Sequence, residues 1–180
     1  MLEFELKVRT SSLDPVRQQL IGHNARFCGR IHEHDIYYNA PHRDFGVTDE
    51  AIRVRYTNDH ALVTYKGAKI KTSGLKAREE LNIVVDSGTV FEQMLDRLGF
   101  TRTAEVNKWR ENYRLFDAAI TLDEVEGLGT FVEIEILAED AHSDTPARIQ
   151  EIAKEIGVDG EPILDSYLEM LLSKRSAAQS

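Results

Sequence analysis

The amino-acid sequence predicts an α+β domain in which about eight mostly antiparallel strands close into a barrel or pack as a sandwich. Two observations support this prediction. Short segments with alternating apolar and charged residues recur along the chain, as in strands with one apolar face. Amphipathic helical segments lie between them, and their apolar stripes need the apolar strand faces as a surface to cover.

Length, composition and charge limit the class of protein. The chain has 180 residues, of which 42% are hydrophobic and 29% charged, as in a soluble globular domain. Its net charge of −9 argues against broad binding of nucleic acid or acidic membranes, and no apolar run is long enough to span a bilayer. One cysteine, Cys28, and no signal-peptide pattern lead us to expect a cytoplasmic protein.

The expected elements follow the chain in two similar halves. Strands are predicted near residues 2–9, 30–39, 51–57, 61–66, 78–85, 104–115, 118–125 and 130–137. Helices are predicted over residues 14–22, 88–98, 144–156 and 166–172, with loops over 40–50 and 67–77. A strand, a helix and then three strands therefore occur twice. We expect a single domain over residues 1–172 and a flexible tail over 173–180.

The charged strand faces must point at solvent or into a polar lumen. On that face, strand parity places the acids Glu3, Glu5, Glu80, Asp123, Glu133 and Glu135, and the bases Lys7, Arg53, Arg55, Lys66, Arg78, Lys108 and Arg110. For one such strand, a solvated sheet face with weak ion pairs is the ordinary explanation. The recurrence of this design favours a lumen, where charges need partners or a ligand.

Both signs of charge in one lumen suggest a metal-bound polyphosphate as ligand. Clustered carboxylates favour a hard cation such as Mg²⁺ or Mn²⁺, and clustered arginines and lysines favour phosphate oxygens. Phosphoryl and nucleotidyl transfer depend mainly on positioning and neutralised charge. The chain contains no P-loop motif.

Other candidate residues carry weaker signals. His32 and His34 share a strand face and could bind a transition metal, although histidines near a loop are common on surfaces. Cys28 follows an apolar residue and is expected to be a small core residue, not a nucleophile. Trp109 alternates with Lys108 and Arg110 and is expected to face the core.

The sequence resembles the CYTH superfamily, the triphosphate tunnel metalloenzymes, over about residues 1–172. The motifs that carry the resemblance are Glu3-x-Glu5-x-Lys7, Arg53-x-Arg55, Thr64-Tyr65-Lys66-Gly67, Arg78-Glu79-Glu80, Lys108-x-Arg110, Leu122-Asp123-Glu124-Val125 and Glu133-x-Glu135. Two segments are most similar to the class IV adenylyl cyclase branch: His34-Asp35-Ile36-Tyr37-Tyr38 and Ser166-Tyr167-Leu168-Glu169. Asn82 departs from relatives that continue the acidic alternation.

The resemblance implies an eight-stranded antiparallel β-barrel, the triphosphate tunnel, with a polar lumen and helices packed outside. It implies Mg²⁺ or Mn²⁺ as cofactor, bound by Glu3, Glu5, Asp123, Glu133 and Glu135. It also implies triphosphate binding by Lys7, Arg53, Arg55, Lys66, Arg78, Lys108 and Arg110. The catalytic residues that it implies are Lys7, Glu80 and Arg110.

The implied activity is that of an adenylyl cyclase, in which the ribose 3′-hydroxyl of ATP attacks the α-phosphorus and expels pyrophosphate. A triphosphatase acting on inorganic triphosphate, thiamine triphosphate or a nucleoside triphosphate would use the same tunnel, metal and bases. A non-catalytic nucleotide or polyphosphate binder is a third alternative. The complete set of acidic metal ligands argues against it, because a protein that only binds phosphate could use bases alone. The implied partners are a triphosphate and a second copy of the chain, and neither nucleic acid nor membrane.

Overall fold

The computed structural model describes residues 2–58, 60–72, 75–139 and 144–178. The strands are β1 (Leu2–Thr10), β2 (Arg26–Asn39), β3 (Ala51–Tyr56), β4 (Ala61–Lys66), β5 (Ile70–Thr72), β6 (Leu75–Val85), β7 (Thr101–Leu115), β8 (Ala118–Val125) and β9 (Gly129–Ala138). The helices are α1 (Asp14–Gly22), α2 (Phe45–Thr48), α3 (Gly88–Arg97), α4 (Thr145–Glu155) and α5 (Tyr167–Ala178). Within the described ranges, none of these helices is long and apolar enough to cross a membrane.

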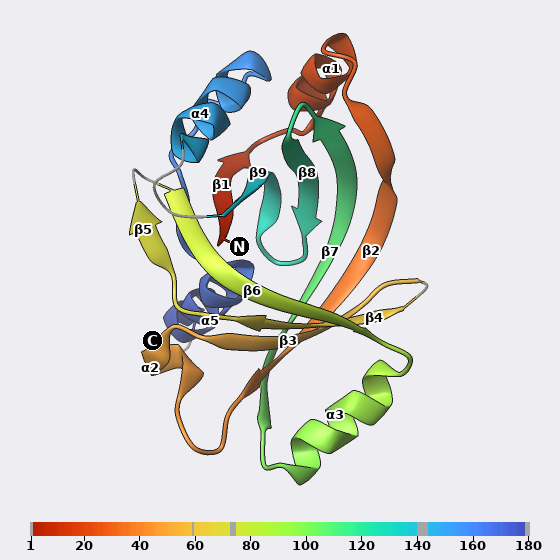
Figure 1. Cartoon of the computed structure of the whole chain (residues 1–180), viewed down its shortest axis with the longest axis vertical. Helices are drawn as coiled ribbons and strands as arrows, with labels where there is room; N and C mark the ends of the chain where they lie inside the picture. The colour runs from red at the N-terminus through yellow and green to blue at the C-terminus, as the bar shows by residue number, and fades with distance from the viewer. Residues whose placement is uncertain (1, 59, 73–74, 140–143, 179–180) are drawn as a thin grey trace.

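Eight of the strands form a closed antiparallel ring (Figure 1). Around the ring the order is β1, β9, β8, β7, β2, β3, β4 and β6, and the pairing of β6 with β1 closes it. At this closure Glu3 stands opposite Arg78. The short β5 pairs with β6 beside the ring. The predicted eight-stranded antiparallel tunnel fold is thereby confirmed.

The two halves of the chain occupy equivalent places in the ring. Matching β1 to β6, β2 to β7, β3 to β8 and β4 to β9 converts the pair β1–β9 into β6–β4, and the pair β8–β9 into β3–β4. The pairs β2–β7 and β1–β6 are the two seams at which the halves meet. The repeated order of elements seen in the sequence therefore corresponds to a pseudo-two-fold arrangement of the ring.

The apolar faces of most strands build cores outside the ring. Helices α1 and α4 contribute to one core over β1, β8 and β9, which includes Phe4, Leu6, Val8, Val16, Leu20, Ile120, Ile134, Ile149 and Ile152. Helix α3 packs over β2, β3 and β4, where Leu95 joins a second core with Val54. Full burial of each such side chain contributes roughly 1.5–3 kcal/mol, so the strand faces that bear these residues are held outward.

Helix α5 departs from the prediction that all helices pack outside the ring. Its first residue, Tyr167, is buried with lumen-facing side chains of β2, β7 and β9, namely Tyr37, Val106 and Phe131. Tyr167 therefore joins a small, mostly apolar core inside this part of the lumen. The helix also continues to Ala178, so residues 173–178, expected as part of a tail, are helical.

Some outer surfaces also differ from expectation. On the outer face of β6, Leu81 and Ile83 are 59% and 61% exposed, so helices do not cover every apolar face. Trp109 points away from the lumen and is 44% exposed, and Cys28 is exposed as well, so neither is a core residue. The segment 67–77 contains β5 and the start of β6 in place of a loop, and its residues 73 and 74 lie outside the described ranges.

Candidate active site in the lumen

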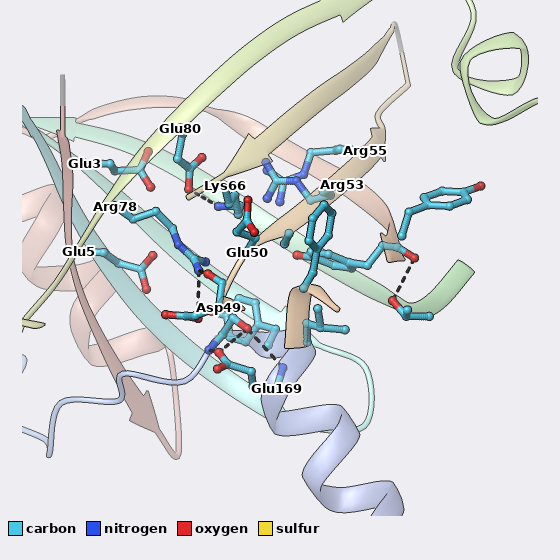
Figure 2. Close-up of a pocket in the computed structure, with 18 of the residues that line it drawn as sticks. Glu3, Glu5, Asp49, Glu50, Arg53, Arg55, Lys66, Arg78, Glu80 and Glu169 are labelled. Atoms are coloured by element: carbon cyan, nitrogen blue, oxygen red, sulfur yellow. Dashed lines mark hydrogen bonds and ion pairs between the residues drawn. The ribbon is translucent and has the colours of Figure 1, made fainter. Parts of the chain in front are cut away.

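A cavity of about 430 Å³ opens into the lumen, a size in the range that suits small-molecule ligands (Figure 2). Its wall contains nearly every residue predicted by strand parity: Glu3, Glu5, Lys7, Arg53, Arg55, Lys66, Arg78, Glu80, Lys108, Arg110, Glu133 and Glu135. Asp123 is the exception, because it is fully buried behind the wall. Ring closure thus brings together charged residues from both ends of the sequence.

Three carboxylates of β1 and β9, which we call the carboxylate cluster, are Glu3, Glu5 and Glu135. Glu5 stands opposite Glu135 in the strand register, and one oxygen of each of the three lies within 4.8 Å of the others. Burial, and then repulsion by Glu80, raises the pKa of Glu3 to about 7. Burial, and then repulsion by Glu3, raises the pKa of Glu135 well above its ordinary value. Such an oxygen-only, under-neutralised set fits a hard divalent cation.

Two residues further along the same strands, acids and bases are paired. Lys7 stands opposite Glu133, and its Nζ lies 3.3 Å from Glu133 Oε1. Arg110 Nε donates to Asp123 Oδ1 at 2.7 Å, and its Nη2 donates to both Asp123 and Glu133. The structure therefore places Asp123 and Glu133, two of the predicted metal ligands, on these two bases and outside the carboxylate cluster.

Two buried acids of β2, Glu33 and Asp35, also lie in this region. Arg55 Nε and Nη2 donate to Asp35 at 2.6 and 2.7 Å, and its Nη1 donates to Glu33 at 3.0 Å. Lys108 Nζ lies 2.9 Å from Glu33 and 3.2 Å from Asp35. Burial alone would raise both pKa values, but the cations outweigh it, holding the pKa of Asp35 well below its ordinary value and that of Glu33 at about 2.

Strand parity applied to the alternating residues Glu33, Asp35 and Tyr37 would have identified these two acids from the sequence. With them, the lumen contains a group of four acids and four bases that neutralise one another. We call it the paired layer, and it consists of Lys7, Glu33, Asp35, Arg55, Lys108, Arg110, Asp123 and Glu133.

Arg53, Lys66 and Arg78 line the cavity with incomplete partners. The Nε atoms of Arg53 and Arg78 are buried and have no hydrogen-bond partner among the described residues. Arg53 Nη2 donates to Thr64 at 3.0 Å, and Lys66 donates to Glu80. Burial, and then repulsion by Arg53, lowers the pKa of Lys66 to about 8. These neighbouring cations therefore carry buried N–H donors that lack acceptors. A bound anion would supply the acceptors, and phosphate oxygens are suitable ones.

The rim of the cavity comes partly from α2 and α5, which the sequence did not associate with the site. Phe45 of α2 and Leu168 and Leu172 of α5 add apolar side chains to its wall. Nearby, Arg78 donates to the backbone oxygen of Asp49 at 2.8 Å (Figure 2). Toward these two helices the cavity wall therefore combines apolar side chains with the acids Asp49, Glu50 and Glu169.

Asn82, the departure from the acidic alternation that the sequence showed, also lines the cavity. Its Oδ1 accepts a hydrogen bond from Thr64 at 2.7 Å, and Thr64 in turn accepts from Arg53. A neutral amide at this position adds no carboxylate partner for Arg53. The guanidinium of Arg53 therefore stays available to an anionic ligand.

His32 and His34 lie outside the lumen, because the acids that alternate with them point inward. His34 Nε2 is 2.7 Å from Glu105 Oε2, and the ring of His32 packs against Trp109 at a centroid distance of 5.0 Å. Within the part of the chain that the structure describes, neither histidine belongs to a metal-ligating group. The alternative of a histidine metal site is therefore not supported.

A closed antiparallel ring, with a carboxylate cluster and under-paired cations in one lumen, defines a tunnel protein suited to a metal-bound polyanion. The CYTH domain model matches residues 1–167, and the chain belongs to the CYTH family. The resemblance read from the motifs is thereby confirmed.

Individual relatives agree with the family and extend over nearly the whole chain. A protein of Methanocaldococcus jannaschii named "Putative adenylate cyclase" is 35% identical over 173 residues, which cover 94% of this chain and 98% of its own. The solved structure of the PH1819 protein from Pyrococcus horikoshii OT3 is 38% identical, covers 96% of this chain and 99% of its own, and has a TM-score of 0.84.

The same fold occurs in HpAC1 from Hippeastrum, whose structure is described as that of a "Putative adenylyl cyclase" with a dominant triphosphatase activity. It is 19% identical, covers 96% of each chain and has a TM-score of 0.72. The fold by itself therefore does not separate the two reactions.

Proposed function

We propose that this chain is a divalent-metal-dependent enzyme of triphosphate substrates, and that it converts ATP into cyclic AMP and pyrophosphate. The observation that carries the proposal is that, within the described part of the chain, acids without an ion pair and bases with unused buried donors share one cavity. Glu3 and Glu135 have no ion pair within 4.0 Å among the described residues, while Arg53 and Arg78 keep buried donors without partners. A triphosphate with a bound divalent cation satisfies both.

The carboxylate cluster would hold the Mg²⁺ or Mn²⁺ ion. Such an ion, when bound, neutralises phosphate oxygens and makes the attacked phosphorus more electrophilic. Asp123 and Glu133 take a different role in this proposal, because they hold Arg110. Their negative charge fixes its guanidinium at the cavity wall.

Arg53, Lys66 and Arg78 would bind the phosphate oxygens, since their donors line the cavity. Glu80 accepts a hydrogen bond from Lys66 and so positions its ammonium group. Charge-assisted bonds to phosphate are stronger than neutral ones, and arginine can make two at once. These residues therefore supply the binding half of the site.

Lys7 and Arg110 would stabilise the charge that develops on the departing pyrophosphate. Burial alone would lower the pKa of both groups, but the acids beside them outweigh it and raise both pKa values. Both therefore stay charged and act as fixed cations, not as bases. Arg55 and Lys108 were also predicted to bind triphosphate. Because they form ion pairs with Asp35 and Glu33 of β2, their role in this proposal is to stabilise the wall of the cavity.

In the proposed reaction the 3′-oxygen forms a bond to the α-phosphorus, the bond from that phosphorus to the bridging oxygen breaks, and the hydroxyl proton is released. The apolar wall formed by Phe45, Leu168 and Leu172 offers contact to an adenosine group. Inorganic triphosphate has no apolar group that could contact this wall. The wall therefore favours a nucleoside triphosphate as the substrate. A triphosphatase, directing water at a terminal phosphorus in the same tunnel, is the second candidate.

Product analysis tests the proposal directly. The protein would be incubated with ATP, inorganic triphosphate or thiamine triphosphate, each with Mg²⁺ or Mn²⁺, beside a chelator control and the Glu135→Gln variant. We expect cyclic AMP and pyrophosphate from ATP with metal, and neither in the controls. ADP and phosphate would identify a triphosphatase, and binding of all three ligands without any turnover would identify a non-catalytic binder.

A further inference from the structure

We infer that Arg110 occupies, in the protein without substrate, the position in which Asp123 and Glu133 would otherwise bind a second divalent cation. The chain then takes up one such cation, at the carboxylate cluster. The inference rests on the proposed function, because it concerns the same lumen, but it is measured without substrate or turnover.

The contacts of Asp123 leave it little capacity to ligate a metal. Its Oδ1 accepts from Arg110 Nε at 2.7 Å, and its Oδ2 accepts from Arg110 Nη2 and from the hydroxyl of Tyr167 at 2.9 Å. The side chain of Asp123 is fully buried, and that of Arg110 is 9% exposed. A cation could reach this carboxylate only by displacing the guanidinium.

Glu133 is held in the same way from two sides. Its Oε2 accepts from Arg110 Nη2, and its Oε1 lies 3.3 Å from Lys7 Nζ. Arg110 and Lys7, which also approaches Glu5, therefore offset most of the negative charge of Asp123 and Glu133 that a second ion would neutralise. An ion that displaced Arg110 would also leave a guanidinium buried without its partners, which is strongly unfavourable.

The carboxylate cluster lies two residues away along β1 and β9, and its acids are less fully paired with bases than Asp123 and Glu133 are. Its three members offer oxygens within 4.8 Å of one another. Lys7 approaches Glu5 at 3.2 Å, but Glu3 and Glu135 make no ion pair within 4.0 Å in the described part of the chain. The register of β1 and β9 produces this difference, because it sets Glu5 opposite Glu135 in the cluster and Lys7 opposite Glu133 two residues further on.

Counting bound Mn²⁺ tests the inference. Metal-free protein would be titrated with Mn²⁺ alone, and the free ion would be followed by electron paramagnetic resonance. We expect one Mn²⁺ per chain for the unchanged protein and for Glu133→Gln, and none for Glu135→Gln. Arg110→Ala should bind two, because it frees the two carboxylates. Arg114→Ala is the matched control, since it removes an exposed arginine of the same strand that lies outside the cavity wall, and it should still bind one.

Two Mn²⁺ ions in the unchanged protein, falling to one in Glu133→Gln, would overturn the inference. So would a count of one in Arg110→Ala if its circular dichroism spectrum matches that of the unchanged protein. If Arg110→Ala does not fold, the first comparison still decides. Failure of all triphosphates to react would refute the proposed function and leave these counts unaffected.

Discussion

Glu5 of β1 lies directly opposite Glu135 of β9 in an antiparallel pair whose next inward-facing step sets Lys7 opposite Glu133. Like charges directly opposite each other in a sheet are destabilising. The first pair therefore retains a repulsion that a bound cation would relieve, whereas the second is satisfied within the protein. This contrast within one strand pair separates the proposed metal position from the paired layer.

Metal-free protein should lose stability as the pH rises from about 5 to about 8. The pKa of Glu3 is about 7 in the folded chain against an ordinary value of 4.5, so the folded chain keeps a proton that the unfolded chain releases. This stabilisation is fully present below pH 4.5 and is lost as the pH rises through about 7. It amounts to about 3 kcal/mol at most for this group. Thermal denaturation at several pH values measures it.

Two variants control this prediction. Glu3→Gln should reduce the pH dependence and leave the part that is due to Glu135, whereas Glu124→Gln, which changes a half-exposed acid paired with Arg30, should not alter it. Saturating Mn²⁺ should also reduce it, because the ion binds the deprotonated carboxylates of the folded chain and therefore stabilises that chain more as the pH rises. An unchanged slope in Glu3→Gln would assign the pH dependence to other groups.

Arg53→Ala and Arg55→Ala should fail in different ways. Arg53 carries a buried Nε without a partner among the described residues, so its loss should weaken triphosphate binding about tenfold or more, or about 1.4 kcal/mol, with little effect on stability. Arg55 holds Asp35 through two hydrogen bonds. Its loss leaves a buried carboxylate under-paired and should cost about 3–5 kcal/mol of stability.

Calorimetric titration with inorganic triphosphate and urea denaturation separate these two effects. Arg114→Ala is a matched control at an exposed position of β7, outside the cavity wall, and should change neither quantity. If both lumen variants lost affinity equally at unchanged stability, the paired layer would have to contact the substrate directly.

Triphosphate binding should weaken as the pH rises through about 8. Burial, and then repulsion by Arg53, holds the pKa of Lys66 at about 8, so its ammonium is charged below this pH and neutral above it. Calorimetric titration at about pH 7 and about pH 9 measures the change, which should be several-fold. Lys66→Gln should bind weakly at both values. A pH step of unchanged size in that variant would point to a different titrating group, such as the ligand itself.

Leu172→Ala should raise the KM for ATP and leave that for inorganic triphosphate unchanged. Leu172 belongs to the apolar part of the cavity wall, which only a nucleoside group would contact. Losing part of this contact should cost about 1 kcal/mol, or about fivefold. Leu137→Ala, at an exposed apolar position of β9 outside the cavity, should affect neither substrate. Equal changes for both substrates would remove the support for a nucleoside triphosphate.

Strand parity was sufficient to find most of the lumen. In β1, the apolar residues Phe4 and Leu6 pack outside the ring, so Glu5 and Lys7 must point inward. This works because a strand has only two faces and the apolar stripes of the helices decide which is outside. The same rule correctly places Trp109 and Leu81 on the outer face of the ring. The further assumption that a helix covers every apolar outer face was wrong for these two residues, because both are exposed.

The sequence by itself determined the two-faced strands and most of the charges that face the lumen, and its family resemblance implied that the strands close into a ring. It did not determine which acid meets which base, because alternation with a period of two is unchanged by a register shift of two residues. Such a shift between β1 and β9 would keep every side chain on its face and yet set Lys7 opposite Glu135. Ring closure, the chosen register and the insertion of Tyr167 into the lumen fix those pairs. They depend on packing between segments distant in the chain, and that is why only the tertiary structure separates the carboxylate cluster from the paired layer.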